Sequence, residues 1–418
     1  MKIAIIGAGI SGNTIAWHLH EHHEITVFEA EQHIGGHSHT HQVNAFGKDF
    51  NIDTGFIVYN DWTYPNFINM LNLLGVETQS SAMSFSVRDE ATGLEYNGTT
   101  LNSLFAQRMN LIRPSFLGMI KDILRFNKEA PLLLNDEEQD APLGEYLTQH
   151  HYGQSFIKRY IIPMGSAIWS ADPEQMFKIP AKFFIRFFHN HGMLSVSDRP
   201  EWRVIKGGSQ AYVEKLTSQF KDRVKLNTAV EKVTRSADGV MIESTNNPPE
   251  HFDFVFFACH SDQALAILQD ASKDESEILG AIPYQNNEIV LHTDSTLMPK
   301  KKLAWAAWNY HVTTEKLGLA TLTYNMNILQ SLDSPEPFLV TLNHTSKIHP
   351  EKIIKTIHYK HPVFTPEGIA AQLRHGEISG INRTAYAGAY WRNGFHEDGV
   401  MSALTALEHF KHFQAAKH

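Results

Sequence analysis

A glycine-rich turn near the start of the chain constrains the fold more than any other feature of the sequence. The apolar run Ile3 to Ile6 leads directly into Gly7-Ala8-Gly9-Ile10-Ser11-Gly12, and apolar residues at helical spacing follow. In such a G-x-G-x-x-G pattern the first glycine permits a tight turn, the second lets a diphosphate approach the backbone, and the third lets helix and strand pack closely. We therefore expect Gly7, Gly9 and Gly12 to hold a dinucleotide.

The residues that follow complete a βαβ unit. A second apolar run, Ile25 to Phe28, ends on Glu29, where a carboxylate can accept hydrogen bonds from the hydroxyls of a ribose. Ile3 to Ile6 carries no polar residue on either side, which predicts a strand of a parallel sheet that helices cover on both faces. Strand, glycines, helix, strand and acid thus stand in the order of a Rossmann-like unit.

Three further motifs lie at wide intervals along the chain. Gly35-Gly36-His37 follows Glu29 closely, and Asp53-Thr54-Gly55 comes next. The runs Thr228 to Val233 and Phe252 to Ala258 predict two strands. Near the end, Tyr386-Ala387-Gly388 precedes Gly394-Phe395-His396-Glu397-Asp398-Gly399 and a final helix predicted from about Gly399.

In this order the motifs resemble the signature of the amine oxidase and phytoene desaturase superfamily of FAD-binding flavoproteins, over more than half of the chain. The resemblance implies non-covalent FAD. Gly35 and Gly36 would pass against its ribityl chain and pyrophosphate, with His37 where the family usually has arginine. Val230 would offer its backbone to the adenine. The C-terminal motif would place a helix N-terminus against the flavin pyrimidine ring, where it stabilises negative charge, through Gly388, Gly394, Phe395, His396 and Glu397. Ala389 and Asp398-Gly399 depart from the family pattern.

The fold class predicted is α/β, with a Rossmann-like FAD-binding domain of the two-dinucleotide-binding type and a mixed α+β substrate domain. We assign 1–62, 200–262 and 378–418 to a discontinuous FAD-binding domain, and 63–199 and 263–377 to the substrate domain. Apolar residues three and four apart predict helices within 67–74, 116–126 and 156–162. Strand-like runs occupy 288–292, 303–308, 320–324 and 338–342, and the polar run 135–140 predicts a surface loop.

Composition argues against several classes of protein. A formal net charge of −9 over 418 residues argues against a nucleic-acid partner. Cys259 is the only cysteine, so the chain can form no internal disulfide, and we expect a small buried residue there rather than a flavin tether. The sequence contains no run near the roughly 18 apolar residues that span a bilayer and no signal-peptide pattern. We therefore expect a cytoplasmic protein.

The chemistry implied by the resemblance is hydride transfer between a substrate carbon and N5 of the flavin. We expect an apolar, lipid or fatty-acyl substrate that is desaturated, saturated or isomerised. The aromatic cluster of 183–188 favours this, as does a resemblance to bacterial predicted flavoproteins whose genes commonly neighbour cyclopropane-fatty-acid-synthase-like methyltransferases. That second resemblance is carried by Trp202-Arg203, by Lys206 to Ser209 and by Trp305 to Tyr310.

Two other functions stay open. One is oxidation of an amine to an imine, by enzymes that often set two aromatic side chains perpendicular to the flavin. The other is a non-catalytic binding protein of the same fold. The sequence assigns neither a catalytic acid or base nor an electron acceptor, and His396, Trp308 and Tyr324 are the candidates for the flavin neighbourhood.

Two segments have alternative interpretations. His37, His39 and His41 alternate, so they would share one face of a strand; we expect contact with cofactor or solvent and no metal, because no supporting carboxylate accompanies them. The segment Leu104 to Lys128 combines basic residues with apolar ones at helical spacing. It predicts a surface helix with a solvated charged face, or else a peripheral contact with an anionic membrane that would suit a lipidic substrate.

Overall fold

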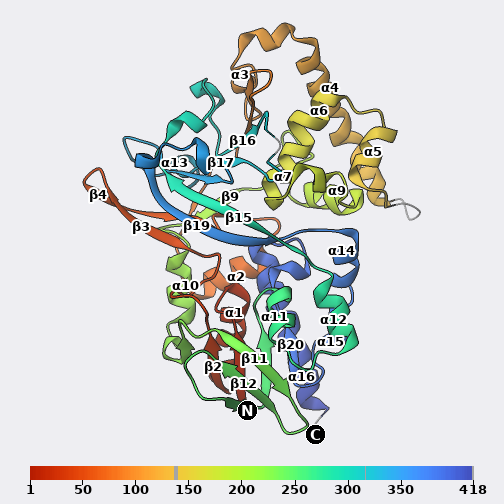
Figure 1. Ribbon diagram of the computed structural model, residues 1–418. Coiled ribbons are helices and arrows are strands. Elements are labelled where there is room, and N and C mark those ends of the chain that lie inside the picture. Colours follow the sequence, from red (N-terminus) through yellow and green to blue (C-terminus); the bar gives the residue numbers. More distant parts are fainter. Residues whose placement is uncertain (136–139, 316, 417–418) are drawn as a thin grey trace.

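Two lobes stacked end to end make up the molecule in the computed structural model, which describes residues 1–135, 140–315 and 317–416 (Figure 1). Both termini lie at the far end of the lower lobe (Figure 1). The polar run predicted as a surface loop falls mainly on 136–139, outside the described residues.

A five-stranded parallel sheet forms the centre of the lower lobe. Its strands lie in the order β10 (Val224–Lys225), β2 (Glu24–Phe28), β1 (Lys2–Ile6), β14 (Phe254–Phe257) and β20 (Thr384–Tyr386). β1 pairs with β2 on one side and with β14 on the other, so Ile3 lies between Ile25 and Phe254. The parallel sheet predicted from the first βαβ unit is confirmed.

Both faces of this sheet are covered. One face packs against helices, namely α1 (Ile10–Leu19), α2 (Pro65–Leu73), α10 (Gln210–Thr217) and α16 (His396–Ala415). The other packs against a three-stranded sheet and helices, namely β11 (Val230–Arg235), β12 (Val240–Ser244), β13 (Glu250–Phe252), α11 (Ser261–Ile267) and α12 (Lys273–Gly280). Ile5 belongs to the first core and Ile6 to the second, as the two-residue period of a strand requires. Helices α2 and α12, which the sequence assigned to the substrate domain, thus pack on the lower sheet, as does α11, which the predicted boundary after residue 262 divides.

The upper lobe contains a seven-stranded sheet. In order, its strands are β19 (Ile353–Pro362), β15 (Tyr284–His292), β18 (Leu339–Leu342), β17 (Leu322–Asn325), β16 (Trp308–Val312), β7 (Phe85–Asp89) and β8 (Leu94–Asn97). All neighbours are antiparallel except β16 and β7. The strand predicted over 303–308 is wrong: Lys302–Ala304 forms a 3₁₀ turn, closed by a bond from the Ala304 amide to the Lys301 carbonyl, and β16 begins only at Trp308.

Helices beside this sheet build a large apolar core. They are α3 (Leu101–Leu104), α4 (Pro114–Glu129), α5 (Leu143–Gln149), α6 (Gln154–Phe156), α7 (Ile162–Trp169), α8 (Pro173–Met176) and α9 (Ala181–Asn190). The core extends from Phe116 on α4 to Phe187 on α9, and Phe395 of the lower lobe packs against it. The two lobes therefore share apolar contacts.

Shorter elements connect the lobes or close their surfaces. They are β3 (Thr40–Ala45), β4 (Lys48–Asp53), β5 (Val58–Asn60), β6 (Thr78–Ser80), β9 (Trp202–Ile205), α13 (Met326–Leu329), α14 (Pro366–Gln372) and α15 (His375–Ile378). In the part of the chain that is described, no helix has both the length and the apolar character needed to cross a bilayer.

Candidate functional site

The candidate site lies where the carboxyl ends of β1, β2, β14 and β20 meet the loops that lead to the upper lobe; we call it the carboxyl edge. In open parallel sheets this edge is the usual place for a ligand. Gly7 turns the chain there with a φ of 103°, and a Cβ on it would lie 2.7 Å from the carbonyl oxygen of Ala258. The turn after β1 therefore requires glycine.

The other two glycines of the motif face different surroundings. A Cβ on Gly12 would lie 1.9 Å from the carbonyl oxygen of Gly7, so helix α1 packs directly on the turn. A Cβ on Gly9 would meet no atom of the described residues within 4 Å. Gly9 also stands at the N-terminus of α1, with no side-chain cap on the first amides. The open side of the loop is thus the side where free N–H groups can bind a diphosphate.

Glu29 lies beside this loop at the end of β2. One carboxylate oxygen accepts from the Ala8 amide at 2.8 Å, and the other accepts from the Glu31 amide at 2.9 Å. Each oxygen of a carboxylate has more than one acceptor direction, so both can also accept from a ribose diol. Its position fits the role predicted from the sequence.

The paired glycines lie across the first glycine loop. The Gly35 amide donates to the Ala8 carbonyl at 2.9 Å, and a Cβ on Gly36 would lie 3.2 Å from the Cα of Gly9. Gly35 and Gly36 have φ values of 134° and 58°, which glycine adopts readily. The two loops together form one cradle.

His37 ends this cradle. Burial lowers the pKa of its imidazole to about 4, so the ring is neutral at pH 7. Its Nε2 is buried and has no hydrogen-bond partner among the described residues, and its ring lies 4.7 Å from that of Tyr359. An unpaired buried nitrogen is costly unless a ligand or water satisfies it. His37 therefore fits a polar contact to a cofactor.

A second helix N-terminus meets the first. A Cβ on Gly399 would lie 2.6 Å from a side-chain carbon of Ile10, and the Ser11 hydroxyl donates to the Gly399 carbonyl at 2.9 Å. The first turns of α1 and α16 are therefore neighbours. Asp398 accepts from the Phe395 amide at 2.9 Å, and burial raises the pKa of its carboxyl to about 7.

Glu397 lies in the same turn but its side chain points elsewhere. Its carboxylate accepts from the backbone amide and side-chain amide of Asn66 at 3.1 and 2.7 Å, and from the Phe67 amide at 2.8 Å. The side chain thus caps helix α2. A cofactor contact predicted for Glu397 would have to come from its backbone.

The structure separates the three candidates for the flavin neighbourhood. The His396 ring stacks on Phe56 at 3.7 Å, and its Nε2 lies 2.6 Å from the Tyr212 hydroxyl. Burial lowers the pKa of His396 to about 3. Trp308 and Tyr324 instead pair in the upper sheet, with ring centroids 5.1 Å apart and planes at 89°. The Trp308 indole nitrogen is buried and finds no hydrogen-bond partner in the described part of the chain.

The remaining predicted residues frame the edge. Val230 begins β11 opposite Ser244, and Gly388 follows β20, where its amide donates to the Ser402 hydroxyl at 2.8 Å. Gly394 has a φ of 89° and lies just before Phe395, whose ring stacks on Phe187 at 5.0 Å. Phe395 therefore connects the carboxyl edge to the aromatic core of the upper lobe.

Sequence reasoning missed several neighbours of the site. Asp53 accepts from the Ser209 amide at 2.9 Å and from the Thr40 hydroxyl at 2.6 Å, and burial raises the pKa of its carboxyl to about 6. The rings of His260 and His361 lie 6.1 and 5.5 Å from that of His37. Asp53 belongs to the Asp53-Thr54-Gly55 motif of the sequence, whereas no sequence pattern indicated His260 or His361.

The alternating histidines do not share one face: His39 packs between His33 and His41, whereas His37 lies against Tyr359. The His39 ring lies 3.8 Å from that of His33 and 4.0 Å from that of His41. Within residues 1–135, 140–315 and 317–416, no group of three or more His, Cys, Asp or Glu side chains is placed to hold a metal ion.

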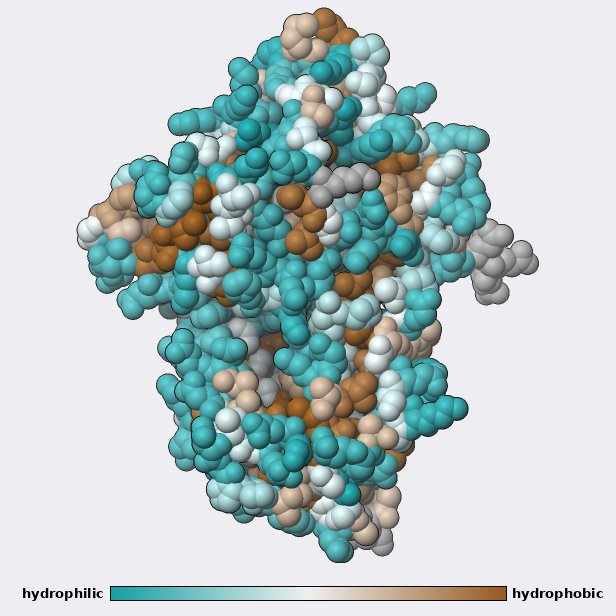
Figure 2. Space-filling view, viewed as in Figure 1, coloured by the Kyte–Doolittle hydropathy of each residue, from teal (hydrophilic) through white to brown (hydrophobic). Residues whose placement is uncertain are grey.

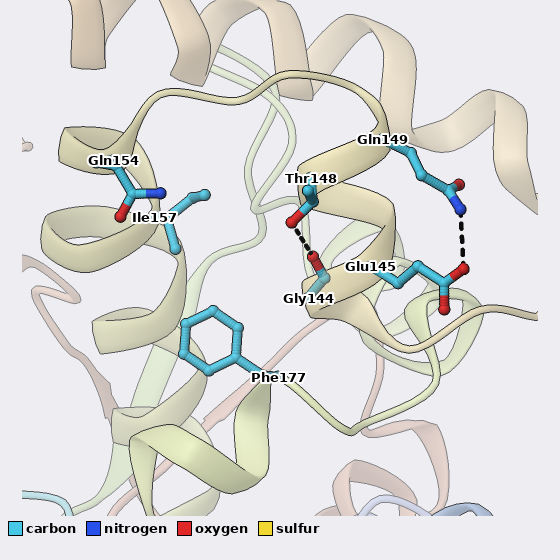
Figure 3. A pocket seen from close by; sticks show the side chains of 7 residues that line it. All are labelled: Gly144, Glu145, Thr148, Gln149, Gln154, Ile157 and Phe177. Carbon is cyan, nitrogen blue, oxygen red and sulfur yellow. Dashed lines mark hydrogen bonds between the residues drawn. The ribbon is translucent and has the colours of Figure 1, made fainter.

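A surface cavity of about 510 Å³ lies elsewhere, in the upper lobe between α5 and α6 (Figure 3). Its polar side chains bond one another or the local backbone: the Thr148 hydroxyl donates to the Gly144 carbonyl at 2.8 Å, and Gln149 donates to Glu145 at 2.9 Å. The cavity contains none of the residues predicted for the site.

Comparison with known proteins agrees with this geometry. The model of the flavin-containing amine oxidoreductase family matches residues 10–406. AofH of Mycobacterium tuberculosis, named provisionally as a flavin-containing monoamine oxidase, is 24% identical over 265 residues, which cover 60% of this chain and 55% of that protein. The chain thus spans about half the length of this curated relative.

Two solved structures share the fold over nearly the whole chain. Cyclohexylamine oxidase from Brevibacterium oxydans IH-35A superposes with a TM-score of 0.68 at 15% identity, covering 98% of this chain and 99% of that one. A CLA-producing fatty acid isomerase from P. acnes superposes with a TM-score of 0.68 at 17% identity, covering 98% of each chain. At these identities the likeness is one of fold.

Proposed function

Because the chain belongs to the family of flavin-containing amine oxidoreductases, we propose that this FAD-dependent oxidoreductase acts on an apolar, lipid or fatty-acyl substrate. The observation that supports this choice is the ring of Phe395. It stands at the start of α16 and stacks on Phe187, which packs at 4.9 Å against Trp169. The side of the site toward the upper lobe is thus aromatic, and apolar surface favours an apolar partner.

FAD, when bound, supplies hydride transfer between N5 of the flavin and a substrate carbon, which permits desaturation, saturation or isomerisation. The protein contributes position and electrostatics. The free amides of α1 favour the negative diphosphate, and those of α16 favour negative charge on the pyrimidine side of the flavin. The raised pKa of Asp398 keeps this carboxyl largely protonated below about pH 7, so it weakens the positive end of α16 little.

The neutral side chains of the edge have complementary roles. His37 offers its unpaired Nε2 to the cofactor without adding charge, since its pKa is lowered to about 4. Phe183 and Phe364 stack at 5.3 Å beside Trp169 and exclude water from the space above the site. Non-covalent attachment is supported by the Cys259 thiol, which is half-buried and whose pKa desolvation raises to about 12, so that it is a poor nucleophile.

The fatty acid isomerase is a precedent for this fold acting on a fatty acid, at the level of analogy only. The amine oxidases of the same fold support the alternative, oxidation of an amine. The crossed pair of Trp308 and Tyr324 also supports that alternative if its rings prove to stand over the flavin.

The test is an anaerobic absorption titration with linoleic acid, stearic acid and cyclohexylamine, combined with chromatography of the extracted lipids. Bleaching of the flavin by a fatty acid indicates desaturation, reoxidation of photoreduced flavin indicates saturation, and a shifted double bond without net redox change indicates isomerisation. Phe183→Ala should reduce the change in flavin absorbance that a fatty acid causes and leave the flavin content unchanged. Phe46 is exposed, and Phe46→Ala should alter neither quantity. Bleaching by the amine alone would contradict the proposal.

A further inference from the structure

The outermost end of the upper lobe exposes a cluster of large apolar side chains. This apical surface comprises the exposed residues of α3, of the 3₁₀ turn Arg108–Ile112 and of α4 (Figure 1). Its apolar members, with their exposed fractions, are Leu101 (77%), Met109 (71%), Leu111 (52%), Ile112 (71%), Leu117 (43%) and Leu124 (55%). Figure 2 shows a few hydrophobic side chains at the tip of this end, with hydrophilic side chains around them. Scattered exposed leucines are ordinary, but such a concentration on one short segment is typical of an interaction surface.

Local contacts hold these residues together. The Arg108 guanidinium donates to the carbonyl oxygens of Asn102 and Phe105, which ties the turn to α3. The Phe105 ring packs edge to face on Phe116, the first buried residue of α4, at 5.8 Å. Asn110 is buried between the exposed Met109 and Leu111. The apolar tips are therefore presented by an anchored turn.

The surface is also basic, in an acidic protein. Between residues 101 and 135 the sequence has five basic residues, namely Arg108, Arg113, Lys121, Arg125 and Lys128, against Asp122 and Glu129, while the whole chain has a net charge of −9. Asp122 forms its ion pair with Arg125, at 3.2 Å, on the side of the helix toward His151. The positive charge of Arg108, Lys121 and Lys128 thus faces solvent.

Apolar and basic residues alternate along the exposed stripe of α4. Leu117, Lys121, Leu124 and Lys128 are spaced by four, three and four residues, so they share one face of the helix. The opposite face buries Phe116, Met119 and Phe126 in the core of the upper lobe. One apolar face of α4 therefore packs in the core, and the exposed stripe adds apolar residues on the opposite face.

We propose that the apical surface docks on an anionic lipid bilayer. Met109, Leu111 and Ile112 would enter the headgroup region, and the lysines and arginines around them would bind anionic headgroups. Charge complementarity selects this occupant, since the apical surface of a second copy would carry the same basic residues and would repel the first. The docking does not depend on the proposed substrate; it adds that a lipid substrate would be taken from the bilayer through the lobe whose core reaches Phe395.

The test is flotation of the purified, flavin-loaded protein with vesicles made of equal amounts of phosphatidylglycerol and phosphatidylcholine, against vesicles of phosphatidylcholine alone. We expect binding to the first kind, little to the second, and release by high salt. Met109→Asp with Ile112→Asp should lower the partition coefficient by about tenfold or more. Lys121→Glu should lower it by about fivefold or more, from the loss of one cation and the gain of one anion near the surface.

Matched controls lie on the lower lobe. Leu373 is 88% exposed, so Leu373→Asp changes an exposed apolar residue outside the apical surface, and Lys273→Glu makes the same charge change at another exposed lysine. Both should bind as the unaltered protein does. Flavin absorbance and the thermal midpoint report folding, so a misfolded variant is recognised. Unaltered binding by the double aspartate variant, salt-independent binding to neutral vesicles, or no vesicle binding at all would overturn the proposal, whatever the substrate.

Discussion

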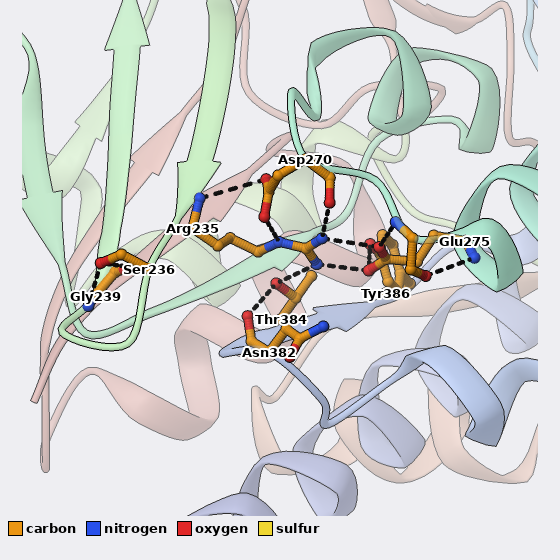
Figure 4. Close-up of polar contacts among 9 residues, drawn as sticks. Arg235, Ser236, Gly239, Asp270, Glu275, Asn382, Thr384 and Tyr386 are labelled. Atoms are coloured by element: carbon orange, nitrogen blue, oxygen red, sulfur yellow. Dashed lines mark hydrogen bonds and ion pairs between the residues drawn. The ribbon is translucent and has the colours of Figure 1, made fainter.

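Two buried polar regions of the lower lobe are organised in opposite ways. The first, the Arg235 junction, joins β11, α12 and β20 through Arg235, Asp270, Glu275, Thr384 and Tyr386 (Figure 4). The second is the carboxyl edge. Both contain buried carboxyl groups, but only the junction supplies them with a cation.

At the junction each charged side chain has a partner of opposite charge. The side chains of Arg235 and Glu275 are each 3% exposed and form two hydrogen bonds of 2.5 and 2.8 Å. The Tyr386 hydroxyl adds a third bond to Glu275 at 2.7 Å. Although burial alone would raise the pKa of Glu275, the bonds from Arg235 hold it below its usual value.

At the carboxyl edge, by contrast, burial dominates. It raises the pKa of Asp53 to about 6 and that of Asp398 to about 7, and it leaves His37 neutral with an unpaired nitrogen. Paired groups hold the fold together, whereas unpaired ones are the groups a ligand can satisfy. The comparison therefore divides residues that act on stability from residues that act on cofactor affinity.

We expect the largest effect to be a difference in the free energy of unfolding between substitutions at Gly12 and at Gly9. Gly12→Ala places a methyl group against the Gly7 carbonyl and should destabilise the protein by more than about 4 kcal/mol in urea unfolding. Gly9→Ala meets open space at a φ of −75°, which alanine accepts, so stability should change by less than about 1 kcal/mol while FAD binds more weakly. Equal effects of the two variants on stability would break the distinction.

Removing the cation of the Arg235 junction should lower the free energy of unfolding almost as much as Gly12→Ala does. Arg235→Met leaves Glu275 buried without its cation, so the free energy of unfolding should fall by about 3–5 kcal/mol, with or without FAD. Lys232→Met is the control, because its 3.4 Å pair with Glu243 is exposed and should contribute less than about 0.5 kcal/mol. A loss seen only in the absence of FAD would assign Arg235 to the cofactor site instead.

The raised pKa of Asp398 predicts a pH dependence. The unfolded chain loses this proton near pH 4 and the folded chain near pH 7, so stability from this group is full below pH 4 and is lost as the pH rises to 7. Asp398→Asn should remove that loss and gain up to about 4 kcal/mol at pH 8 relative to pH 4. Urea unfolding at both values measures it, and parallel pH curves for variant and parent would refute the assignment.

The smallest effect concerns Glu29. Glu29→Gln replaces a charged acceptor of ribose hydroxyls by a neutral one, which should weaken FAD binding by about 1.5–3 kcal/mol, or about ten- to a hundredfold. Stability without FAD should fall by about 1–3 kcal/mol, because the single amide oxygen accepts from one of the two backbone N–H groups and leaves the other without an acceptor. Fluorescence titration of the FAD-free protein measures affinity, and an unchanged dissociation constant would remove Glu29 from the site.

Much of the lower lobe could be predicted because its signals are local. The unbroken apolar run of β1, the glycine turn and the apolar spacing of α1 each depend on neighbours within a few residues. The strand predicted over 303–308 failed because the polypeptide there turns at Lys302–Ala304 before pairing, which its apolar composition does not reveal.

The side-chain partners in the site could not be predicted in the same way. His396 meets Tyr212, 184 positions away, and Glu397 caps α2, 330 positions away. The sequence placed both residues near a helix N-terminus, but neither contact leaves a pattern in the sequence around it.

By itself, the sequence determined that this chain builds a parallel sheet with a dinucleotide loop and a flavoprotein signature, because the order of apolar runs, glycines and acid is a pattern of neighbouring residues. The tertiary structure decided which polar groups are paired and which are left for a ligand. It alone placed Glu275 against Arg235 while leaving His37 unpaired. The physical reason is that burial and the approach of distant strands and helices set these pairings, and both arise only when the chain folds.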